Sequence, residues 1–368
     1  MKNPLSDTIY LKRRHEKEAP IRGAYFRDQT AIIHSLPFRR LKHKTQVFFA
    51  PENDHVCTRI EHVLHVATIA KSICLGLNQF AWNLDADLAF AIGLGHDLGH
   101  APFGHEGEYF LNKRLGGGNS FIHEVNSYRV VEYLANNGQG LNLTYAVKDG
   151  IISHNGESFE QYLIPDNTEK KLDLVHDRKI KPASYEGCIV RFSDKIAYLG
   201  RDIEDAITAG FIKRKDIPLK VRLKLGDNNS QIIDNLVNDI INTSKNEQQI
   251  GFSDKIFVQL KTLKDFNYKR IYLHDKKVRN RIVAGKIIYA LFDYLLVLYE
   301  RYEKDYKRYA KLDLKFEREF GDYLQSMHDF YLNENNPEQI ISDYISGMTD
   351  SFAMDCMQQI SFPQSIFL

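Results

Sequence analysis

The residues best suited to chemistry gather in one stretch, residues 96–108, with the sequence HDLGHAPFGHEGE. Its 13 positions hold three histidines, one aspartate and two glutamates. The adjacent His96 and Asp97 can offer an imidazole nitrogen and a carboxylate oxygen to one divalent cation. Glycine and proline residues then break the helix, so that His105 can return toward the pair. The stretch therefore predicts part of a metal site.

Two ligands are too few to hold an ion, so other helices must supply the rest. His62, on a preceding helix, and Asp194, on a later one, are the best-placed candidates. Each has a competing interpretation: His62 as an ordinary polar-face residue, and Asp194 as the salt-bridge partner of Arg191 or Lys195. The segment around the His-Asp pair is apolar and therefore buried. Burying these side chains without a metal or a pairing network would cost on the order of several kcal/mol.

The elements that must position these side chains are helices. Apolar residues recur with helical spacing from Ile60 to Leu77 and again from Leu88 to Gly95. The sequence therefore predicts an all-α fold, a helical bundle. Strand-like alternation is short, over residues 45–50 before a turn-rich segment, and predicts one small β-hairpin on the helical body.

The bundle is interrupted by two polar stretches, residues 115–120 and 155–185, which carry Gly, Pro, Asn and Lys without helical period. They predict loops, and loops of this kind often border sites. After residue 210 the chain becomes charged and rich in tyrosine. We therefore expect a catalytic domain over residues 1–210 and a helical C-terminal region over 211–368 that packs on it.

Composition excludes several classes of protein. The 368 residues carry 49 Lys+Arg against 48 Asp+Glu and are 43% hydrophobic, which is typical of a globular chain and not of a disordered one. A net charge of +1 lacks the overall field of a dedicated nucleic-acid or membrane-surface protein. Four cysteines without a Cys-x-x-Cys pair argue against a disulfide framework and a thiolate zinc site. Because no signal-peptide-like stretch opens the chain, we expect a cytoplasmic, non-membrane protein.

Several short motifs together resemble one known family. They are FRD at 26–28, FRRL at 38–41, KTQV at 44–47, RIEH at 59–62, HDLGHAPFGHEGE at 96–108, FIHE at 121–124 and SDKIAY at 193–198. This set resembles the HD superfamily and, within it, the deoxynucleoside triphosphate triphosphohydrolases, the dGTPase group. The resemblance covers residues 22–210 and, more weakly, 264–280 and 344–350.

The resemblance implies a reaction and a metal. The family cleaves a dNTP between the 5′ oxygen and the α-phosphorus, and it releases a deoxynucleoside and tripolyphosphate. Its metal shell falls here on His62, His96, Asp97 and Asp194. We expect one divalent ion per site, Mn, Mg, Co, Ni, Fe or Zn, because this donor set suits several of them.

The resemblance also implies roles for other residues. The catalytic positions are His105 and Glu108, with His100 and His123 facing the phosphates. Contacts to phosphate and sugar carry over to Arg59, Lys195, Tyr198 and Asp202, to Gln46 near the 3′ hydroxyl, and to Tyr272 near the sugar or base.

The spacing of the residues agrees with such chemistry. A triphosphate carries about four negative charges and needs a cation with Arg or Lys to neutralise it. Asp194, Tyr198 and Asp202 recur every four residues, so one helix stripe can present all three. His105 and Glu108 are three residues apart and can pair, which raises the basicity of the imidazole for proton transfer.

Other functions stay open. The same metal site could hydrolyse another phosphoester, such as a nucleoside monophosphate, a cyclic nucleotide or guanosine tetraphosphate. A non-catalytic nucleotide sensor, or weak binding of single-stranded DNA, could use the basic runs at residues 39–44 and 213–224, although such runs are more typical of a solvated face. An allosteric nucleotide also stays open, and the apolar, aromatic C-terminal helices favour a homo-oligomer. We expect His154 to be a helix-end or loop residue rather than a ligand.

Overall fold

The structure is a computed structural model, and it describes residues 1–18, 21–47, 57–155 and 159–362. Helices make up most of it, which confirms the all-α prediction. The helices up to the long loop are α1 (Asp7–Tyr10), α2 (Ala24–Ile33), α3 (Leu36–Arg40), η1 (Leu41–His43), α4 (Arg59–Asn78), α5 (Ala86–Gly95), α6 (His105–Arg114), α7 (His123–Arg129), η2 (Val130–Leu134), α8 (Ala135–Gly138) and α9 (Tyr145–Ile152).

The rest of the chain is also helical. Its elements are β1 (Tyr162–Leu163), η3 (Leu172–Leu174), α10 (Tyr185–Thr208), η4 (Arg214–Asp216), α11 (Leu219–Lys224), α12 (Asn229–Ser244), β2 (Ile250–Gly251), α13 (Asp254–Asn267), η5 (Tyr268–Tyr272), α14 (Asp275–Tyr302), α15 (Tyr306–Tyr309), α16 (Lys315–Ser326), α17 (Pro337–Ser346) and α18 (Asp350–Ser361). β1 and β2 pair antiparallel, with Tyr162 opposite Gly251.

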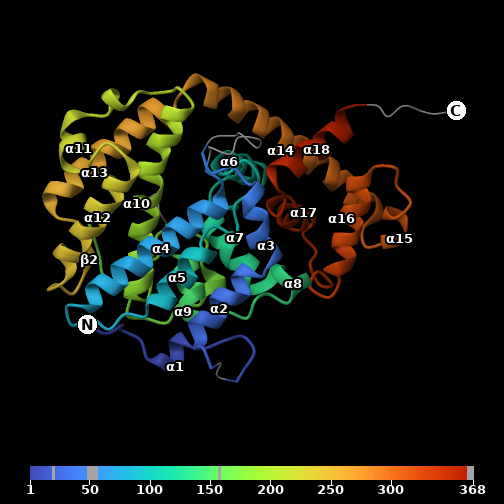
Figure 1. Ribbon diagram of the computed structural model, residues 1–368. Helices are drawn as coiled ribbons and strands as arrows, with labels where there is room; N and C mark the ends of the chain where they lie inside the picture. Colours follow the sequence, from blue (N-terminus) through green and yellow to red (C-terminus); the bar gives the residue numbers. More distant parts are fainter. Residues whose placement is uncertain (19–20, 48–56, 156–158, 363–368) are drawn as a thin grey trace.

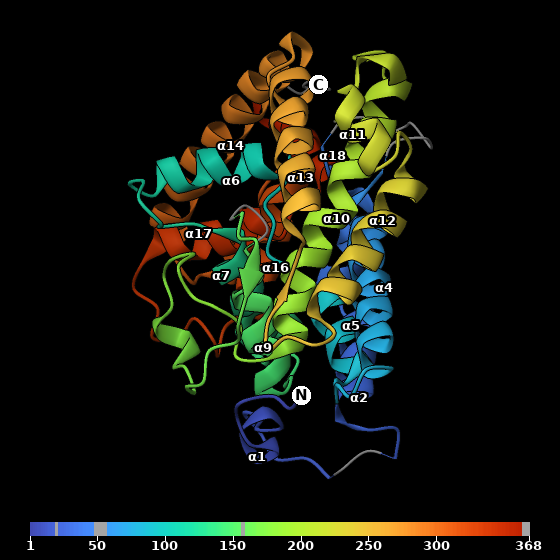
Figure 2. The same ribbon diagram turned by 90° about the vertical axis from the view of Figure 1, so that its left-hand side faces the viewer.

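The helices α4, α5 and α10 form the centre of the molecule (Figure 1). α11, α12 and α13 lie on one side of this centre, and α15 to α18 lie on the other. Figure 2 shows α10, α12 and α13 running beside one another. Local sequence explains where the central helices begin. A capping box of Thr58 and Glu61 opens α4, Asp85 caps α5, and Ser184 caps α10.

Two apolar cores hold the molecule together. The first joins α4, α5, α9 and α10 and continues into α11, α12 and α13. The second is built by α14 to α18, and Ala101, Leu111 and Phe121 from the neighbourhood of the HDLGH segment also belong to it. The C-terminal helices are therefore packed against the segment that carries the predicted site. The division of the chain at residue 211 stays a prediction.

The predicted β-hairpin and the two predicted loops can be compared with the structure. The proposed hairpin at residues 45–50 lies mostly outside the described residues, and an antiparallel bridge joins Thr45 to Thr58 at its base. Both predicted loops are confirmed. Residues 115–120 form turns with three glycines at positive φ, and the described part of 155–184 contains only β1 and η3 as regular elements.

Among the described residues, two helices, α4 and α14, are long and apolar enough to cross a membrane by length and composition alone. Half of each apolar window is buried inside the protein, as in a core helix of a globular domain. α4 packs against α5 and α10, and α14 packs against α6 and α17. The length and composition of α4 and α14 are therefore weak evidence for a membrane-spanning segment.

Candidate active site

The His-Asp pair directly follows the buried helix α5. Gly99, two residues beyond Asp97, packs against α7 so closely that a Cβ there would lie 2.1 Å from the backbone nitrogen of Ser127. The side chain of Asn126 donates a 2.7 Å hydrogen bond to the carbonyl of Gly99. A glycine is therefore required at this turn, and the turn fixes where His96 and Asp97 point.

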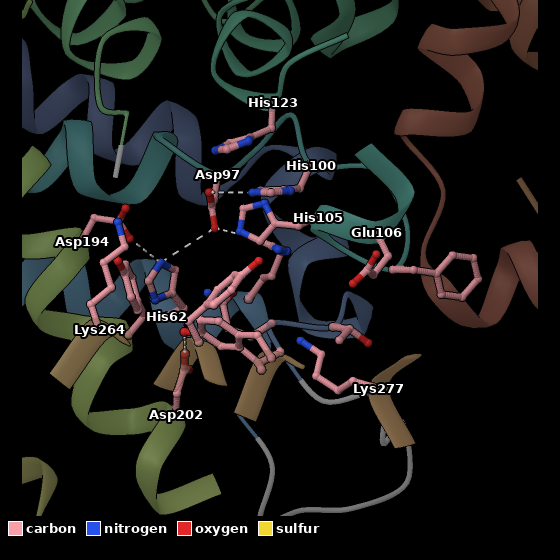
Figure 3. A pocket seen from close by; sticks show the side chains of 18 residues that line it. His62, Asp97, His100, His105, Glu106, His123, Asp194, Asp202, Lys264 and Lys277 are labelled. Atoms are coloured by element: carbon pink, nitrogen blue, oxygen red, sulfur yellow. Dashed lines mark hydrogen bonds and ion pairs between the residues drawn. The ribbon is translucent and has the colours of Figure 1, made fainter. Parts of the chain in front are cut away.

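The four predicted metal ligands come together where α4, α10 and the end of α5 converge. Figure 3 shows three of them, His62, Asp97 and Asp194, around one point. Nε2 of His62 lies 3.0 Å from Oδ1 of Asp194 and 3.9 Å from Oδ2 of Asp97. Nε2 of His96 lies 3.5 Å from Oδ1 of Asp97 and 3.8 Å from Oδ1 of Asp194. Ligand atoms about 2.0–2.2 Å from one central ion are separated by about 3–3.5 Å. The four donors are thus spaced nearly as such an ion requires.

The hydrogen bonding of His96 also fits a metal. Its Nδ1 lies 2.8 Å from the carbonyl oxygen of Gly93, so Nδ1 carries the proton and donates it. Nε2 then presents a lone pair toward the carboxylates, and this buried atom has no hydrogen-bond partner within the described residues. A ligating histidine is oriented in this way, by a carbonyl on its other nitrogen. Two imidazoles and two carboxylates form a donor set that suits Mn, Fe, Co, Ni or Zn.

Burial and neighbouring charges set the protonation of this cluster. Burial lowers the pKa of His96. Burial alone would raise the pKa of Asp97, but His96, His100 and Arg59 hold it well below its usual range. Burial opposes ionisation of Asp194 as well, yet its hydrogen bond with His62 keeps the pKa of that carboxyl low. Both carboxylates are therefore ionised at neutral pH, as ligands must be.

A second group of donors lies beside the first. His100, His105, Glu108 and His123 bring their ligand-type atoms within 4.8 Å of one another. The ring of His100 stacks on that of His123 at 3.9 Å, and Nε2 of His100 lies 3.2 Å from Oδ1 of Asp97. Nδ1 of His105 is 3.3 Å from Oε2 of Glu108, which also lies 2.9 Å from Nδ1 of His123. The side chain of His105 is 55% exposed, whereas the other three members are buried.

Both ring nitrogens of His123 are engaged by protein groups. Nδ1 faces Glu108, and Nε2 lies 3.2 Å from Nε2 of His154. His154 donates from Nδ1 to the carbonyl of Ile151, so its Nε2 accepts. Burial alone would lower the pKa of His123, but Glu124 and Glu108 raise it to about 9. These hydrogen bonds fix the orientation of the His123 ring, which also lines the cavity. The expectation that His123 faces the phosphates stays a prediction.

His154 is the residue that the sequence analysis underrated. It is the second residue after α9, as the helix-end interpretation expects, yet it is buried and its ring lies 4.9 Å from that of His96. Burial and the neighbouring His96 lower its pKa to about 4. The feature that could have indicated its burial is its position two residues after α9, a helix in which every residue is buried.

One cavity of about 490 Å³ connects these groups to a second polar cluster. His62, Asp97, His100, His105, His123 and Asp194 line one end. Asp202, on α10, lies at the other side of the cavity from His123 in Figure 3. The hydroxyl of Tyr272 donates a hydrogen bond to it. Burial raises the pKa of Asp202 to about 7, and the bond from Tyr272 opposes that rise. Gln46 and Tyr198 also line the cavity.

Of the two cationic residues predicted to contact phosphate, Arg59 and Lys195, only Arg59 lines the cavity. Arg59 lines the cavity and bonds to Asp97. Lys195 does not line it: the buried ammonium group lies 3.3 Å from Glu160 and over the rings of Phe159 and Phe192. The salt-bridge interpretation of Asp194 is wrong, since Arg191 and Lys195 both pair with Glu160.

Two other lysines line the cavity and were missed by the sequence analysis, Lys264 on α13 and Lys277 on α14. Burial lowers the pKa of Lys277. Among many charged residues of the C-terminal half, neither has a local pattern that marks it. Glu108 and His96 lie behind the cavity wall, where they contact residues that line it.

The comparisons with known proteins agree with this architecture. The HD domain family matches residues 59–199, and the phosphohydrolase-associated domain family matches residues 250–336. Proteins named deoxyguanosinetriphosphate triphosphohydrolase-like protein are 38% identical in Caldanaerobacter subterraneus (96% of this chain, 89% of that one) and 37% identical in Clostridium tetani (95% and 89%).

A crystal structure of a phosphohydrolase from Bacteroides thetaiotaomicron matches with a TM-score of 0.51 at 16% identity, over 89% of this chain and 68% of that one. At this identity the match bears on the fold alone. The two sequence relatives span nearly the whole chain at well over 30% identity. The chain therefore belongs to the family of deoxyguanosinetriphosphate triphosphohydrolase-like proteins and is a metal-dependent phosphohydrolase of the HD type.

Proposed function

We propose that this protein hydrolyses deoxynucleoside triphosphates at the α-phosphorus and releases a deoxynucleoside and tripolyphosphate. The observation that carries the proposal is the layout of one cavity, with a metal-type donor set at one end and the Asp202 and Tyr272 pair at the other. The names of the relatives point to the same class of substrate, with guanine as the base. The base preference of this chain is measured by comparing the four dNTPs as substrates.

The metal end suits the α-phosphate. His62, His96, Asp97 and Asp194 would hold a divalent cation, and its positive charge would polarise a phosphoryl oxygen and orient water. His100 and Asp97 lie in hydrogen-bond contact beside that position. The carboxylates keep the donor set anionic, so the site favours a cation over a neutral ligand.

His105 is the group that handles the proton. It begins α6, its ring is the exposed member of the histidine cluster, and Glu108 one turn later holds Nδ1. With Nδ1 held, Nε2 is the atom that can meet the 5′ oxygen of the leaving deoxynucleoside. Glu108 is fixed in turn by His123 and by Arg178, whose Nη2 lies 2.6 Å from Oε1. The orientation of His105 is thus set by a buried network.

The remaining residues divide the substrate between them. Arg59 and Lys264 are cations on the cavity wall and neutralise the phosphate tail. Gln46 and the Asp202–Tyr272 pair offer polar atoms to the deoxyribose, and the rings of Tyr198, Tyr268 and Tyr272 offer flat surfaces to a base. Lys195 acts on the phosphates only if Glu160 releases it, so we assign it no direct contact.

The test is product analysis. Each of the four dNTPs is incubated with the protein and with Mn²⁺, Mg²⁺, Co²⁺, Ni²⁺, Fe²⁺ or Zn²⁺, and products are separated by anion-exchange chromatography. Tripolyphosphate and deoxynucleoside in equal amounts are expected, with loss of both in His96→Ala and retention in His34→Ala, an exposed histidine of the same chain. Orthophosphate or pyrophosphate as the first product, or nucleotide binding without turnover, contradicts the proposal and favours one of the alternative functions.

A further inference from the structure

Helix α18 contacts two walls of the cavity through a buried carboxylate, Asp350. Asp350 is the first residue of α18 and is 2% exposed. Its Oδ2 accepts a 2.9 Å hydrogen bond from the backbone nitrogen of Thr45, and its Oδ1 accepts a 2.8 Å hydrogen bond from the backbone nitrogen of Phe103. Thr45 and Phe103 both line the cavity, on separate segments of the chain. A single side chain therefore ties two walls of the cavity to one another.

A second buried residue makes a parallel link. Nζ of Lys44 donates to the carbonyl of His100 and, at 2.7 Å, to the carbonyl of Ser346, the last residue of α17. Lys44 is 3% exposed, and burial lowers its pKa to about 7. Hydrogen bonds of these two side chains, Lys44 and Asp350, with backbone groups thus connect the segment before Gln46, the HDLGH segment and the α17–α18 corner.

The wall that Asp350 holds is locally strained. Phe103 has φ 67°, an unusual value for a residue with a side chain, and Gly104 has φ 61°. A Cβ on Gly104 would lie 2.8 Å from Nη2 of Arg59 and 3.3 Å from the carbonyl oxygen of Thr45. The turn before His105 is therefore pressed against Arg59 and the Thr45 segment. Such a conformation persists only when surrounding contacts enforce it.

Asp350 is not needed to begin its own helix. The hydroxyl of Thr349 accepts from the backbone nitrogen of Phe352 and caps α18. Ala353 and Cys356 anchor α18 in the second apolar core. The two hydrogen bonds of Asp350 therefore go to the cavity walls and not to the helix that carries it.

We propose that Asp350 is a positioning residue of the active site, which fixes the segment of Gln46 relative to the turn that carries His105. The inference rests on the proposed function, because it is there that Gln46 meets the 3′ hydroxyl and His105 meets the 5′ oxygen. It gives α18, which carries none of the four proposed metal ligands, a role in catalysis. Misplacement of reacting groups by about 1 Å can cost up to about a hundredfold in rate.

The experiment compares full-length Asp350→Ala and Asp350→Asn with Asp355→Asn, an exposed aspartate on the same helix. Amide hydrogen exchange is followed for peptides containing Thr45 and Phe103, together with metal content. Asp350→Ala is expected to raise exchange at these two segments at least about tenfold with α14 to α17 unchanged, since both amides lose their acceptor. Asp350→Asn keeps one acceptor oxygen and gives an intermediate effect, and Asp355→Asn gives none.

Kinetics supply the second measurement. We expect kcat to fall roughly tenfold to a hundredfold in Asp350→Ala with metal content retained. Selectivity for a dNTP over the matching 2′,3′-dideoxynucleoside triphosphate is also expected to fall, because the Gln46 segment is no longer held in position next to the 3′ hydroxyl. A variant with merely lower stability would not change this ratio.

Two results overturn the inference: wild-type kcat and selectivity in Asp350→Ala, or exchange that rises equally throughout α14 to α18, which indicates a purely structural role. Failure of the proposed function looks different, since wild-type protein then releases no tripolyphosphate. In that event exchange at Thr45 and Phe103 still decides whether Asp350 holds the two walls.

Discussion

Nη1 of Arg59 lies 2.5 Å from Oδ2 of Asp97, and both side chains are almost fully buried. Over the described part of the chain, the other guanidinium nitrogens Nε and Nη2 have no hydrogen-bond partner, although the side chain lines the cavity. One arginine can therefore orient a proposed metal ligand with one nitrogen and meet a phosphate oxygen with the others.

This double contact predicts the behaviour of Arg59→Ala. Its KM for a dNTP rises and its kcat falls, because the phosphate charge is present in both ground and transition states. Metal affinity is also expected to fall roughly tenfold to a hundredfold, since Asp97 loses its orienting partner. Metal titration of chelator-treated protein checks this, with the exposed Arg39→Ala as control. Unchanged metal affinity shows that Asp97 is held without Arg59.

The acid-base assignment makes a separate prediction. His105→Ala and Glu108→Gln are each expected to lower kcat by roughly 10² to 10⁴ with metal content retained, the usual contribution of a positioned proton donor. Steady-state kinetics and elemental analysis of the same samples provide the measurement. If His105→Ala keeps a near-normal kcat or loses its metal, His105 is not the proton shuttle, and His100 becomes the candidate.

Much of the site was predictable because it is local in sequence. The stripe of Asp194, Tyr198 and Asp202 lines one cavity, as the helical spacing requires. Lys195 shows the limit of such reasoning. It is adjacent to Asp194, and successive residues of a helix point about 100° apart, so one faces the cavity and the other faces Phe159 and Phe192.

Contacts between distant segments could not be predicted in this way. His154 joins the cluster because α9 ends beside α5, and Lys264 and Lys277 enter the cavity because α13 and α14 border it. Nothing in the local pattern marks Asp350 as the residue that bonds to Thr45 and Phe103. The all-α class follows from helical periodicity, whereas these meetings depend on how the helices pack.

The contributions of the two ends of the cavity to substrate binding can be measured separately with tripolyphosphate, an inhibitor that contains only the phosphate part of the substrate. Tyr272→Phe removes the hydroxyl that donates to Asp202, so KM for a dNTP is expected to rise while competitive inhibition by tripolyphosphate is unchanged. Lys264→Met is expected to weaken tripolyphosphate inhibition at least about fivefold, as loss of a charge-assisted contact does. Inhibition constants measured with both variants decide the matter. Weaker tripolyphosphate inhibition in Tyr272→Phe contradicts the assignment of the two ends.

Alkaline pH is expected to destabilise the metal-free protein through His123. Burial lowers its pKa, but Glu124 and Glu108 more than offset burial and raise it from 6.5 to about 9. The folded state therefore keeps a proton that the unfolded state releases. This stabilisation is complete below about pH 6.5 and is lost as pH rises through about 9, on the order of 3 kcal/mol in all.

Urea denaturation of wild type and His123→Gln across pH 6 to 9.5 measures this dependence. The wild-type free energy of unfolding is expected to fall with rising pH more steeply than that of the variant. Parallel curves would show that His123 binds no extra proton in the folded protein.

Metal removal provides the last test. His62, His96, Asp97 and Asp194 place two imidazoles and two carboxylates in a buried cluster, and Nε2 of His96 has no hydrogen-bond partner within the described residues. An ion that binds only the folded state adds about 2.7 kcal/mol at a hundredfold excess over its Kd. Chelation is therefore expected to lower Tm, and added Mn²⁺ is expected to restore it. In His62→Ala and His96→Ala, Tm should no longer respond to the ion, whereas His34→Ala, at the exposed end of α2, should respond like wild type. A response to metal that survives both substitutions would place the ion elsewhere, with the neighbouring group of His100, His105, Glu108 and His123 as the next site to mutate.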